Sequence, residues 1–275
     1  MVTLGADPEL FMVNRGTDEL IPSCGLLGGR KGAPVPIPGL DEPGFGMQED
    51  NVMLEFNIPP ATSWVTATDN VSKAMQYIEA NVMAPLGAKM SDKCWAELTQ
   101  EQTYMPQARV VGCSVDNDAH NEGRYMPRMT ARRMGDMRYA GGHVHLGYES
   151  AVPKHVAALM MDLFVGLWSI GRDDQGPRRS LYGNAGRYRE TEYGIEYRPL
   201  SNFWITKEAR DCGYTSHVFA KAEECGHLLE SDPRKVRDVF LGTNWGMVAQ
   251  VMRTQDVSRA ATMRSMVRND WQIGV

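Results

Sequence analysis

The sequence predicts an α+β protein, because strand-like and helix-like stretches both recur along the chain. Four separate stretches alternate polar with apolar residues, as β-strands do when they expose one face. Other stretches repeat apolar residues every three or four positions, which is typical of helices that pack on a core. These helical stretches span residues 67–83, residues 153–171 and most of the chain beyond about residue 206.

The composition is that of an ordinary globular protein. Its 275 residues are 43% hydrophobic and 23% charged, enough for one large domain or two modest ones. The net charge of −5 gives no overall attraction to nucleic acid or to an anionic membrane. We expect neither a signal peptide nor a membrane-spanning segment. The five scattered cysteines lack Cys-x-x-Cys pairs, which predicts reduced thiols and a cytoplasmic location.

Two histidines are at the centre of the functional prediction. His143 and His145 are two positions apart in the strand-like stretch 141–148, so both imidazoles should lie on one face. Paired imidazoles that face one way are a candidate metal site. The alternative interpretation is that one or both rings are hydrogen-bonded groups of the core or of its rim.

The N-terminal stretch carries a second polar face. We expect a strand over residues 2–13, with Asp7 and Glu9 on one face and apolar residues on the other. Pro8 cannot donate to a neighbouring strand, so this strand should begin irregularly or lie at an edge. A solvated rim is the alternative explanation for the two acids.

Residues 21–48 are rich in glycine and proline and should be mainly loop. Within them, residues 28–32 could wrap an anion with backbone N–H groups and with the cations Arg30 and Lys31. The Gly-Lys-Ser/Thr ending and the following helix of a Walker A motif are missing. A plain surface loop is the alternative interpretation.

A third polar face is expected on a single strand over residues 49–58. Glu49, Asn51, Glu55 and Asn57 alternate there with apolar residues. A solvated face explains such alternation in most antiparallel sheets, and it remains the alternative.

The middle of the chain predicts a strand that runs into an acidic turn over residues 110–120. Asp116 lies in this turn and could contact a substrate amine, although an Asx-type turn also explains it. A basic segment follows, which would attract phosphate beside an active site and is otherwise a solvated surface. Its arginines are Arg124, Arg128, Arg132, Arg133 and Arg138.

A fourth polar face is predicted near the end of the densely charged segment 172–202. Glu196 and Arg198 share one face of a predicted strand, although an acid beside an arginine is often only a salt bridge. Beyond residue 206 we expect two or three helices, with Asp232 and Pro233 as the cap and the first residue of one of them. This part of the chain shows no catalytic constellation, and we interpret it as scaffold or interface.

A sheet face that carries all of these polar groups cannot be an apolar core, because burying several unpaired charges is costly. This face is therefore either exposed to solvent or occupied by cations. Carboxylates, imidazoles and arginines around one concave face suit divalent cations together with a polyphosphate. Magnesium or manganese fits these donors better than zinc. The residues concerned are Asp7, Glu9, Glu55, Asn57, His143, His145, Glu196 and Arg198.

The order of five motifs resembles a known family, the phage amidoligases. These are a branch of the carboxylate-amine ligases, similar to glutamate-cysteine ligase and more remotely to glutamine synthetase. The resemblance spans roughly residues 4–204. The motifs are Gly-Ala-Asp-Pro-Glu-Leu-Phe (5–11), Glu-Phe-Asn-Ile-Pro-Pro (55–60), Gly-Cys-x-x-Asp (112–116), Gly-Gly-His-Val-His-Leu-Gly (141–147) and Arg-Tyr-Arg-x-Thr-x-Tyr-Gly-Ile-Glu-Tyr-Arg-Pro-Leu (187–200).

The resemblance implies a fold and a set of ligands. The fold would be a curved, mainly antiparallel sheet, a glutamine synthetase-like funnel with helices packed on its outer face. Residues 1–275 would form one ligase domain, with residues 205–275 as its helical C-terminal portion. ATP and magnesium, or manganese in its place, would bind inside the funnel.

Matching positions imply the role of each site residue. The metal ligands would be Glu9, Glu55, His143 and Glu196, with Asp7 and His145 as further ligands or their neighbours. The phosphates of ATP would be held by Arg187, Arg189 and Arg198, with Lys31 of the glycine-rich loop as a further candidate. Asn57 would face the acyl substrate. The first motif departs from the Glu-x-Glu of glutamate-cysteine ligases, since this chain has Asp7-Pro8-Glu9.

The implied reaction joins a carboxylate to an amine through an acyl phosphate, at the expense of ATP. Arg198, Arg189 and Asn57 would take part in catalysis, and Asp116 is the candidate base. The substrates would be small molecules or peptides, and a phage-encoded enzyme would act in the cytoplasm of the infected bacterial host. The alternatives are a metal-dependent amide hydrolase, a cupin-like metal-binding protein and a phage structural protein. Metal-dependent ATP binding would separate the ligase from all three.

Overall fold

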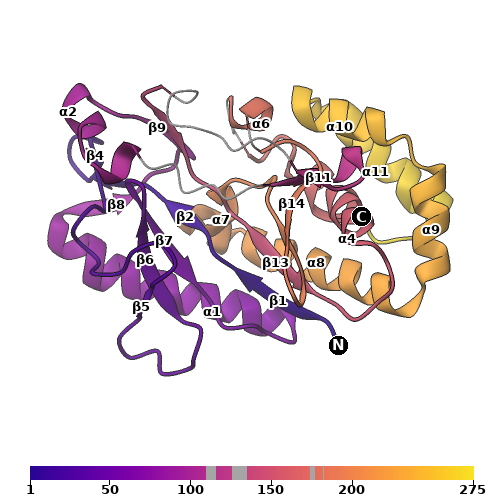
Figure 1. Cartoon of the computed structure of the whole chain (residues 1–275), viewed down its shortest axis with the longest axis horizontal. Coiled ribbons are helices and arrows are strands. Elements are labelled where there is room, and N and C mark those ends of the chain that lie inside the picture. The colour runs from indigo at the N-terminus through magenta and orange to yellow at the C-terminus, as the bar shows by residue number, and fades with distance from the viewer. Residues whose placement is uncertain (110–115, 126–134, 174–176, 182) are drawn as a thin grey trace.

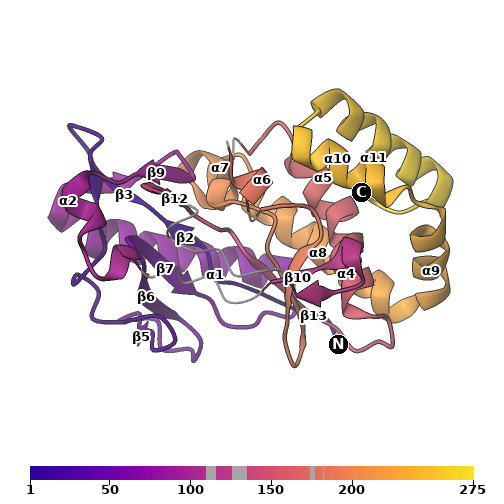
Figure 2. The same ribbon diagram turned by 45° about the horizontal axis from the view of Figure 1, so that its top comes forward.

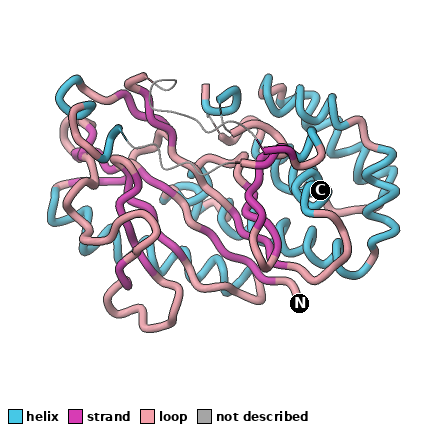
Figure 3. The backbone as a smooth tube through the Cα atoms, in the orientation of Figure 1, coloured by secondary structure: helices cyan, strands magenta, loops and turns pink. Residues whose placement is uncertain are grey.

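The computed structural model describes residues 1–109, 116–125, 135–173, 177–181 and 183–275. The fold mixes helices with antiparallel sheets, as the sequence predicts (Figure 1). In Figure 3 the strands gather in the centre and on the left, and helices lie below them and to the right. Residues 110–115 and Arg128, Arg132 and Arg133 lie outside the described residues, so part of the predicted strand 110–120 and of the basic segment is not described.

A six-stranded sheet forms the centre of the molecule, and all of its strand pairs are antiparallel. Gly5, His145, Glu196 and Arg189 are successive register partners across four of its strands. Because register partners project on the same face, this row brings distant parts of the sequence together. The strands, in spatial order, are β1 (Thr3–Ala6), β13 (Val144–Gly147), β15 (Gly194–Tyr197), β14 (Arg187–Glu190), β10 (Asn117–Asp118) and β11 (Arg124–Tyr125).

The described residues also form three smaller antiparallel sheets. The four-stranded sheet consists of β2 (Glu9–Leu10), β7 (Met53–Asn57), β6 (Gly46–Asp50) and β5 (Val35–Pro36). The three-stranded sheet consists of β4 (Leu20–Ile21), β3 (Met12–Asn14) and β8 (Ala88–Met90). The last sheet pairs β12 (Met137–Tyr139) with β9 (Trp95–Glu97).

The single strand predicted over residues 2–13 is wrong. This stretch forms β1, β2 and β3, which belong to three different sheets. The chain leaves the central sheet at Asp7-Pro8, because Pro8 has no N–H to continue the ladder. Its carbonyl instead accepts from the N–H of Phe56 at 3.3 Å, and the N–H of Glu9 donates to the carbonyl of Gly141 at 2.8 Å.

The single strand predicted over residues 49–58 is also wrong. The chain turns at Asn51, which has a left-handed backbone with φ of 58°, so β6 and β7 form a hairpin. Asparagine tolerates this conformation better than most residues do. As a result, Glu49 and Asn51 are not on the same strand as Glu55 and Asn57.

Two of the predicted helices are confirmed. The first is α1 (Trp64–Tyr77), which continues through a π-helical turn over Ile78–Met83. The second contains α4 (Lys154–Met161), a π-helical turn over Asp162–Gly166 and α5 (Leu167–Ser169). Both bury the apolar stripe that the sequence shows.

The C-terminal part is helical, but it contains five helices where the sequence predicted two or three. Asp232 accepts from the N–H of Lys235 at 3.0 Å, and Pro233 follows, so the predicted cap is confirmed. Short breaks at Gly213, Thr243 and Gln255 divide the rest. The helices are α7 (Lys207–Asp211), α8 (Tyr214–Ser231), α9 (Pro233–Gly242), α10 (Trp245–Thr254) and α11 (Val257–Trp271). Elsewhere in the described residues, two short helices are α2 (Gln100–Thr103) and α6 (Arg178–Leu181).

Helices α1, α4 and α8 contact the central sheet through β1, β13, β14 and β15 (Figure 2). A continuous hydrophobic cluster runs through this layer and extends from Val2 to Val275. Tyr197 of β15 belongs to the helix-facing side, where its hydroxyl donates to Asp162 at 2.6 Å. Its neighbours Glu196 and Arg198 therefore project on the other side of the sheet. None of the helices in the described ranges is long and apolar enough to cross a membrane.

Candidate active site

The segment Asp7-Pro8-Glu9 joins the central sheet to the four-stranded sheet. Asp7 directly follows β1 of the first sheet, and Glu9 begins β2 of the second. The change of sheet turns the two acids toward different neighbours, so each belongs to its own group of polar side chains. We call the group Asp7, His145 and Glu196 the first cluster, and the group Glu9, Asp50 and Glu55 the second cluster.

The first cluster lies on the polar face of the central sheet. One ligand atom from each member lies within 4.8 Å of the others. His145 Nε2 is 3.1 Å from Asp7 Oδ1, and its Nδ1 is 2.8 Å from the hydroxyl of Tyr193. The buried ring of His143 lies beside the cluster, with Nδ1 at 3.3 Å from both Asp7 Oδ1 and Glu196 Oε1. The structure thus brings together four residues that the sequence singled out.

The second cluster consists only of carboxylates, and all three are buried. Glu9 and Glu55 are register partners on β2 and β7, and Asp50 ends the neighbouring strand β6. Their ligand oxygens also lie within 4.8 Å of one another. Lys31 of the glycine-rich loop pairs with Asp50, so its ammonium faces the acids.

Sequence reasoning missed Asp50 as a member of this site. Its position follows from the hairpin turn at Asn51, which makes the chain return along β6 as β7. The dipeptide Asp50-Asn51 is a common turn sequence and could have indicated the hairpin. Tyr193 was also missed, because nothing in its local pattern shows that it lies over His145.

Two arginines hold the carboxylate of Glu196. Arg189 Nη1 is 3.0 Å from Glu196 Oε2, and Arg198 Nη1 pairs with Oε1. The buried Arg198 also places its Nε 2.8 Å from Asp116 Oδ1. Asp116, predicted as a base, therefore lies at the edge of the first cluster. Arg187 is buried at the start of β14, as the register partner of Asp118.

The positive groups around the first cluster control its ionisation. Burial alone would raise the pKa of Asp7, but the charge of His145 and the hydrogen bonds from the rings of His143 and His145 outweigh it and lower the pKa well below its usual value. Burial likewise opposes ionisation of Glu196, yet the Arg198 guanidinium lowers its pKa. For His143, burial and the charge of Arg198 lower the pKa, which favours the neutral ring that a metal ligand needs.

The second cluster has the opposite character. Burial, followed by the charge of Asp50, raises the pKa of Glu9 to about 8. Burial and the charges of Asp7 and Glu9 raise the pKa of Glu55 well above its usual value. The pKa of Lys31 is raised despite burial, because Asp50 and Glu9 stabilise its ammonium. One lysine thus faces three crowded carboxylates.

Buried polar atoms without a protein partner lie in both parts of the site. Within the described residues, Glu55 Oε2, Asn57 Oδ1 and His143 Nε2 have no hydrogen-bond partner. Unsatisfied buried atoms of this kind are rare and call for a ligand, a water or an ion. Oxygen-only donors, as in the second cluster, suit magnesium or manganese, and a carboxylate-imidazole set also accepts these ions. The residues present therefore fit a divalent cation.

Two glycines allow the His143 strand to approach the second cluster. The N–H of Gly141 donates to Glu9 Oε2 at 2.7 Å. A Cβ on Gly141 would meet His143 Nε2 at 2.3 Å, and one on Gly142 would meet the carbonyl oxygen of Ser201 at 2.1 Å. The Gly-Gly pair of this motif is thus required by close packing, and it links the two clusters.

The fold and the site define an α+β protein with a buried, highly charged centre on one face of its sheets. Residues 128–231 match the family model described as phage phiEco32-like COOH.NH2 ligase-type 2. This match confirms the resemblance to phage amidoligases that the sequence motifs indicated, over a segment that includes β13, β14 and β15. It supports a ligase that joins a carboxylate to an amine. A search of curated proteins finds no match to the chain.

Proposed function

We propose that this protein is an ATP- and magnesium-dependent ligase that joins a carboxylate to an amine through an acyl phosphate. The observation that carries the proposal is the pair of adjoining clusters with ligand atoms left unpartnered at Glu55 and His143. The family match over residues 128–231 supports the ligase class.

We propose further that the sheets together form a glutamine synthetase-like funnel within a single domain of residues 1–275. The continuous hydrophobic cluster from Val2 to Val275 supports one domain. The helices of residues 205–275 would act as scaffold. The enzyme would work in the cytoplasm of an infected bacterial host, where ATP is available.

Divalent cations would be held by the two clusters. Glu9, Glu55 and Asp50 offer oxygens to one ion, and Asp7, His145, Glu196 and the neighbouring His143 offer oxygens and nitrogens to another. Bound magnesium, or manganese in its place, would supply positive charge that neutralises phosphate oxygens. His143 lies between the clusters, with Nδ1 toward Asp7 and Nε2 against Gly141.

The arginines would orient the phosphates of ATP. Arg189 is the best placed of them, because its side chain is 36% exposed and only one of its nitrogens pairs with Glu196 in the described structure. Arg198 is buried between Glu196 and Asp116 and would act through these carboxylates and through its charge. The further candidates are Arg187, the register partner of Asp118, and Lys31, which pairs with Asp50 of the second cluster.

In the proposed reaction, an oxygen of the substrate carboxylate attacks the γ-phosphorus of ATP, and ADP leaves. The chain's guanidinium groups stabilise charge on the transferred phosphoryl group. The amine nitrogen then attacks the acyl carbon, the C–O bond to phosphate breaks, and phosphate departs. Asn57, with its buried unpartnered Oδ1, would orient the acyl substrate, and Asp116 is the proposed acceptor of the amine proton.

The test is the melting temperature of the protein with magnesium, with a non-hydrolysable ATP analogue, and with both. We expect the analogue to raise the melting temperature only when magnesium is present. A metal-dependent amide hydrolase or a cupin-like protein would respond to the metal with no further response to the nucleotide. No response to either ligand would refute the ligase proposal.

A further inference from the structure

A cavity of about 210 Å³ adjoins the first cluster. His145 of this cluster lines it, together with Tyr193, whose hydroxyl lies 2.8 Å from His145 Nδ1. Gly5, the register partner of His145, lines it as well. Because register partners project on the same face, the cavity lies on the face of the central sheet that carries the candidate active site.

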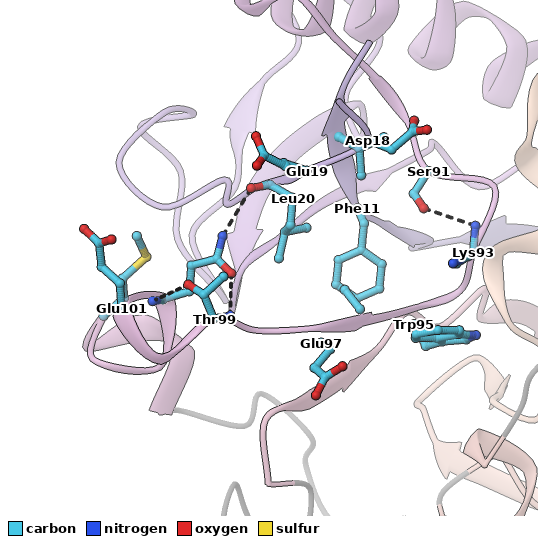
Figure 4. Close-up of a pocket in the computed structure, with 14 residues that line it drawn as sticks. Phe11, Asp18, Glu19, Leu20, Ser91, Lys93, Trp95, Glu97, Thr99 and Glu101 are labelled. Atoms are coloured by element: carbon cyan, nitrogen blue, oxygen red, sulfur yellow. Dashed lines mark hydrogen bonds between the residues drawn. The ribbon is translucent and has the colours of Figure 1, made fainter. Parts of the chain in front are cut away.

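The larger cavity around Phe11, of about 610 Å³, has a different character. Figure 4 shows Glu101 and Trp95 on opposite sides of it, with Glu97 apart from both. Its charged groups thus do not converge on one point, and none of the described residues that line it belongs to either cluster. By contrast, the smaller cavity shares His145 with the candidate active site.

A glycine on β1 leaves the smaller cavity open. A Cβ on Gly5 would meet His145 Cβ at 3.4 Å, which is an ordinary van der Waals contact, and the backbone of Gly5 is not left-handed. At Gly147, by contrast, a Cβ would meet Thr3 Oγ1 at 2.1 Å, so close packing requires that glycine. Neither packing nor backbone conformation requires Gly5, although glycine weakens the interior of a strand. The missing side chain keeps space free beside His145.

The remaining walls of this cavity are mainly apolar. Ile58 and Pro60 come from the segment after β7, which bridges to β1 between Leu4 and Ala61. An apolar cavity of about 150 Å³ can hold a benzene ring, so this cavity has room for about six carbon atoms.

Hydrogen-bonding groups in the cavity are few and already engaged. His145 Nε2 lies 3.1 Å from Asp7 Oδ1, and its Nδ1 faces the hydroxyl of Tyr193. Thr3 is the other polar side chain among the described residues of the lining. A purine base would leave ring nitrogens without partners here, which lowers affinity. An aliphatic group has no such requirement.

We propose that this cavity, which we call the apolar subsite, binds the aliphatic tail of the carboxylate substrate. The inference rests on the proposed ligase function and specifies its substrate class, a carboxylic acid with an aliphatic chain of about six carbons. The tail lies over Gly5, between His145 and Pro60.

The row of register partners directs the carboxylate of this substrate toward the arginine at the rim. Glu196 is the register partner of His145, and Arg189 Nη1 lies 3.0 Å from Glu196 Oε2. Neighbouring strands are about 4.8 Å apart, so Gly5 and Glu196 are separated by about 10 Å, which is comparable to the length of such a substrate. The partly exposed guanidinium of Arg189 attracts the carboxylate, whereas it repels an ammonium group.

The binding test measures the dissociation constants of acetate, butanoate, hexanoate and decanoate by calorimetry, with magnesium and without ATP. Affinity should rise about fourfold for each methylene added between butanoate and hexanoate, and should change little from hexanoate to decanoate. Equal affinities for butanoate and hexanoate would overturn the apolar subsite. A gain that continues unchanged to decanoate would indicate association with an open apolar surface and would overturn it as well.

Gly5→Ala tests the position of the tail. The added methyl group fills part of the apolar subsite, so hexanoate should bind about fourfold more weakly and butanoate less than about twofold more weakly. A higher melting temperature would show that the variant is folded. The matched control is Gly16→Ala in the exposed turn after β3, where a Cβ would lie 3.5 Å from Asn14 Oδ1. Equal affinity of the two variants for hexanoate would contradict the proposal.

Tyr193 provides a second, independent pair of variants. Tyr193→Phe keeps the ring that lines the apolar subsite, so the dependence on chain length should remain. Tyr193→Ala removes the ring and should bind hexanoate about threefold more weakly than Tyr193→Phe. Equal binding by these two variants would exclude Tyr193 from the apolar subsite and overturn its proposed boundary.

The reaction test uses ATP, magnesium, the same acids and hydroxylamine as the amine. The nitrogen of hydroxylamine forms the C–N bond while the C–O bond to phosphate breaks. Phosphate leaves with the electron pair, and the nitrogen gives up one proton to a base. The Michaelis constant should be lower for hexanoate than for butanoate, and Gly5→Ala should raise the value for hexanoate about fourfold.

The outcomes separate the apolar subsite from the ligase function. Binding that depends on chain length, with neither ADP nor hydroxamate formed, would count against the ligase function and leave the subsite in place. Hydroxamate formation with equal Michaelis constants for all chain lengths would overturn the subsite and leave the ligase function in place. Displacement of hexanoate by adenosine would show that the cavity holds the base of ATP and would overturn its assignment to the carboxylate substrate.

Discussion

The two clusters contain similar carboxylates, but the protein treats them differently. The first cluster is compensated: His143, His145, Arg189 and Arg198 surround its acids, and the pKa of Glu196 is lowered. The second cluster has Lys31 for three buried acids, and the pKa of Glu9 is raised to about 8. The protein's own side chains therefore balance the charges of the first cluster, whereas the acids of the second cluster need a bound cation or protons to neutralise them.

This difference separates the roles that the clusters can have. A preorganised set of charges stabilises charge that develops during a reaction without having to rearrange. A set of crowded, uncompensated acids destabilises the folded chain and binds cations strongly, because each cation relieves the repulsion. We infer that mutations in the first cluster affect mainly turnover, and mutations in the second affect mainly metal binding and stability.

The largest effect is expected for Glu196→Gln in the first cluster. The amide keeps the shape but loses the charge that faces His143 and the two arginines, so ATP turnover should fall more than about 100-fold. The measurement is ADP release with saturating magnesium. Glu190→Gln, at the exposed end of β14, is the matched control and should keep wild-type turnover. Unchanged turnover in Glu196→Gln would remove the first cluster from the active site.

Glu55→Gln tests the second cluster, and the expected effect on stability has the opposite sign to that of most core mutations. The amide cannot ionise, so the variant avoids the cost of either burying this charge or keeping the carboxyl protonated. The free energy of unfolding of the metal-free protein should rise by about 1–3 kcal/mol at pH 8. The increase in melting temperature that magnesium produces should disappear. Urea unfolding with and without chelator provides both quantities.

Lys31→Met is the natural counterpart of Glu55→Gln. It removes the cation that pairs with Asp50, so the metal-free protein should become less stable while its response to magnesium grows. If Glu55→Gln and Lys31→Met change stability in the same direction, charge crowding is not what distinguishes the second cluster.

The first cluster could be predicted from the sequence more completely than the second. His145 and Glu196 lie on the regular strands β13 and β15, and His143 and Arg198 each lie one residue beyond the end of these strands. A spacing of two fixes a common face for each pair. The spacing of two therefore predicts the polar faces of β13 and β15, and the pairing of these strands in one sheet brings the two polar faces together.

The second cluster depends on features that local pattern does not contain. Asp50 reaches it through the left-handed turn at Asn51, and Glu9 reaches it because the chain changes sheet at Pro8. Alternation of residue types continues through both breaks, so periodicity alone predicts single strands there. The sequence identifies Lys31 as a cation in a glycine-rich loop. Its orientation toward the acids of the second cluster depends on tertiary packing, which the local sequence does not show.

The pH dependence of stability should distinguish the clusters further. The folded protein keeps a proton on Glu9 up to a pKa of about 8, whereas the unfolded chain releases it near 4.5. Between these values the folded state binds more protons, so stability should fall as pH rises, by at most about 1.4 kcal/mol per pH unit from this group. Magnesium must displace this proton, so its affinity should rise over the same range.

The measurement is urea unfolding in chelator between pH 5.5 and pH 7.5, for wild type and for Glu9→Gln. The variant should show a smaller loss of stability over this range. His217, whose pKa burial lowers to about 4, contributes a change of opposite sign, because its stability is lost as pH falls below 6.5. This contribution is the same in both proteins and cancels in the comparison. Parallel curves would show that Glu9 titrates normally.

The smallest effects are expected for arginine-to-lysine changes beside the first cluster, and they separate the effect of charge from that of geometry. Arg198→Lys keeps the charge but cannot pair with Asp116 and Glu196 at once, so ATP turnover should fall about tenfold. Arg189→Lys, at the half-exposed rim of the site, should lower ATP turnover about threefold, because one flexible ammonium can still reach Glu196 or a phosphate. Turnover and the Michaelis constant for ATP are measured for both. A larger loss in Arg189→Lys would mean that the rim arginine, not the buried one, sets the geometry of phosphate binding.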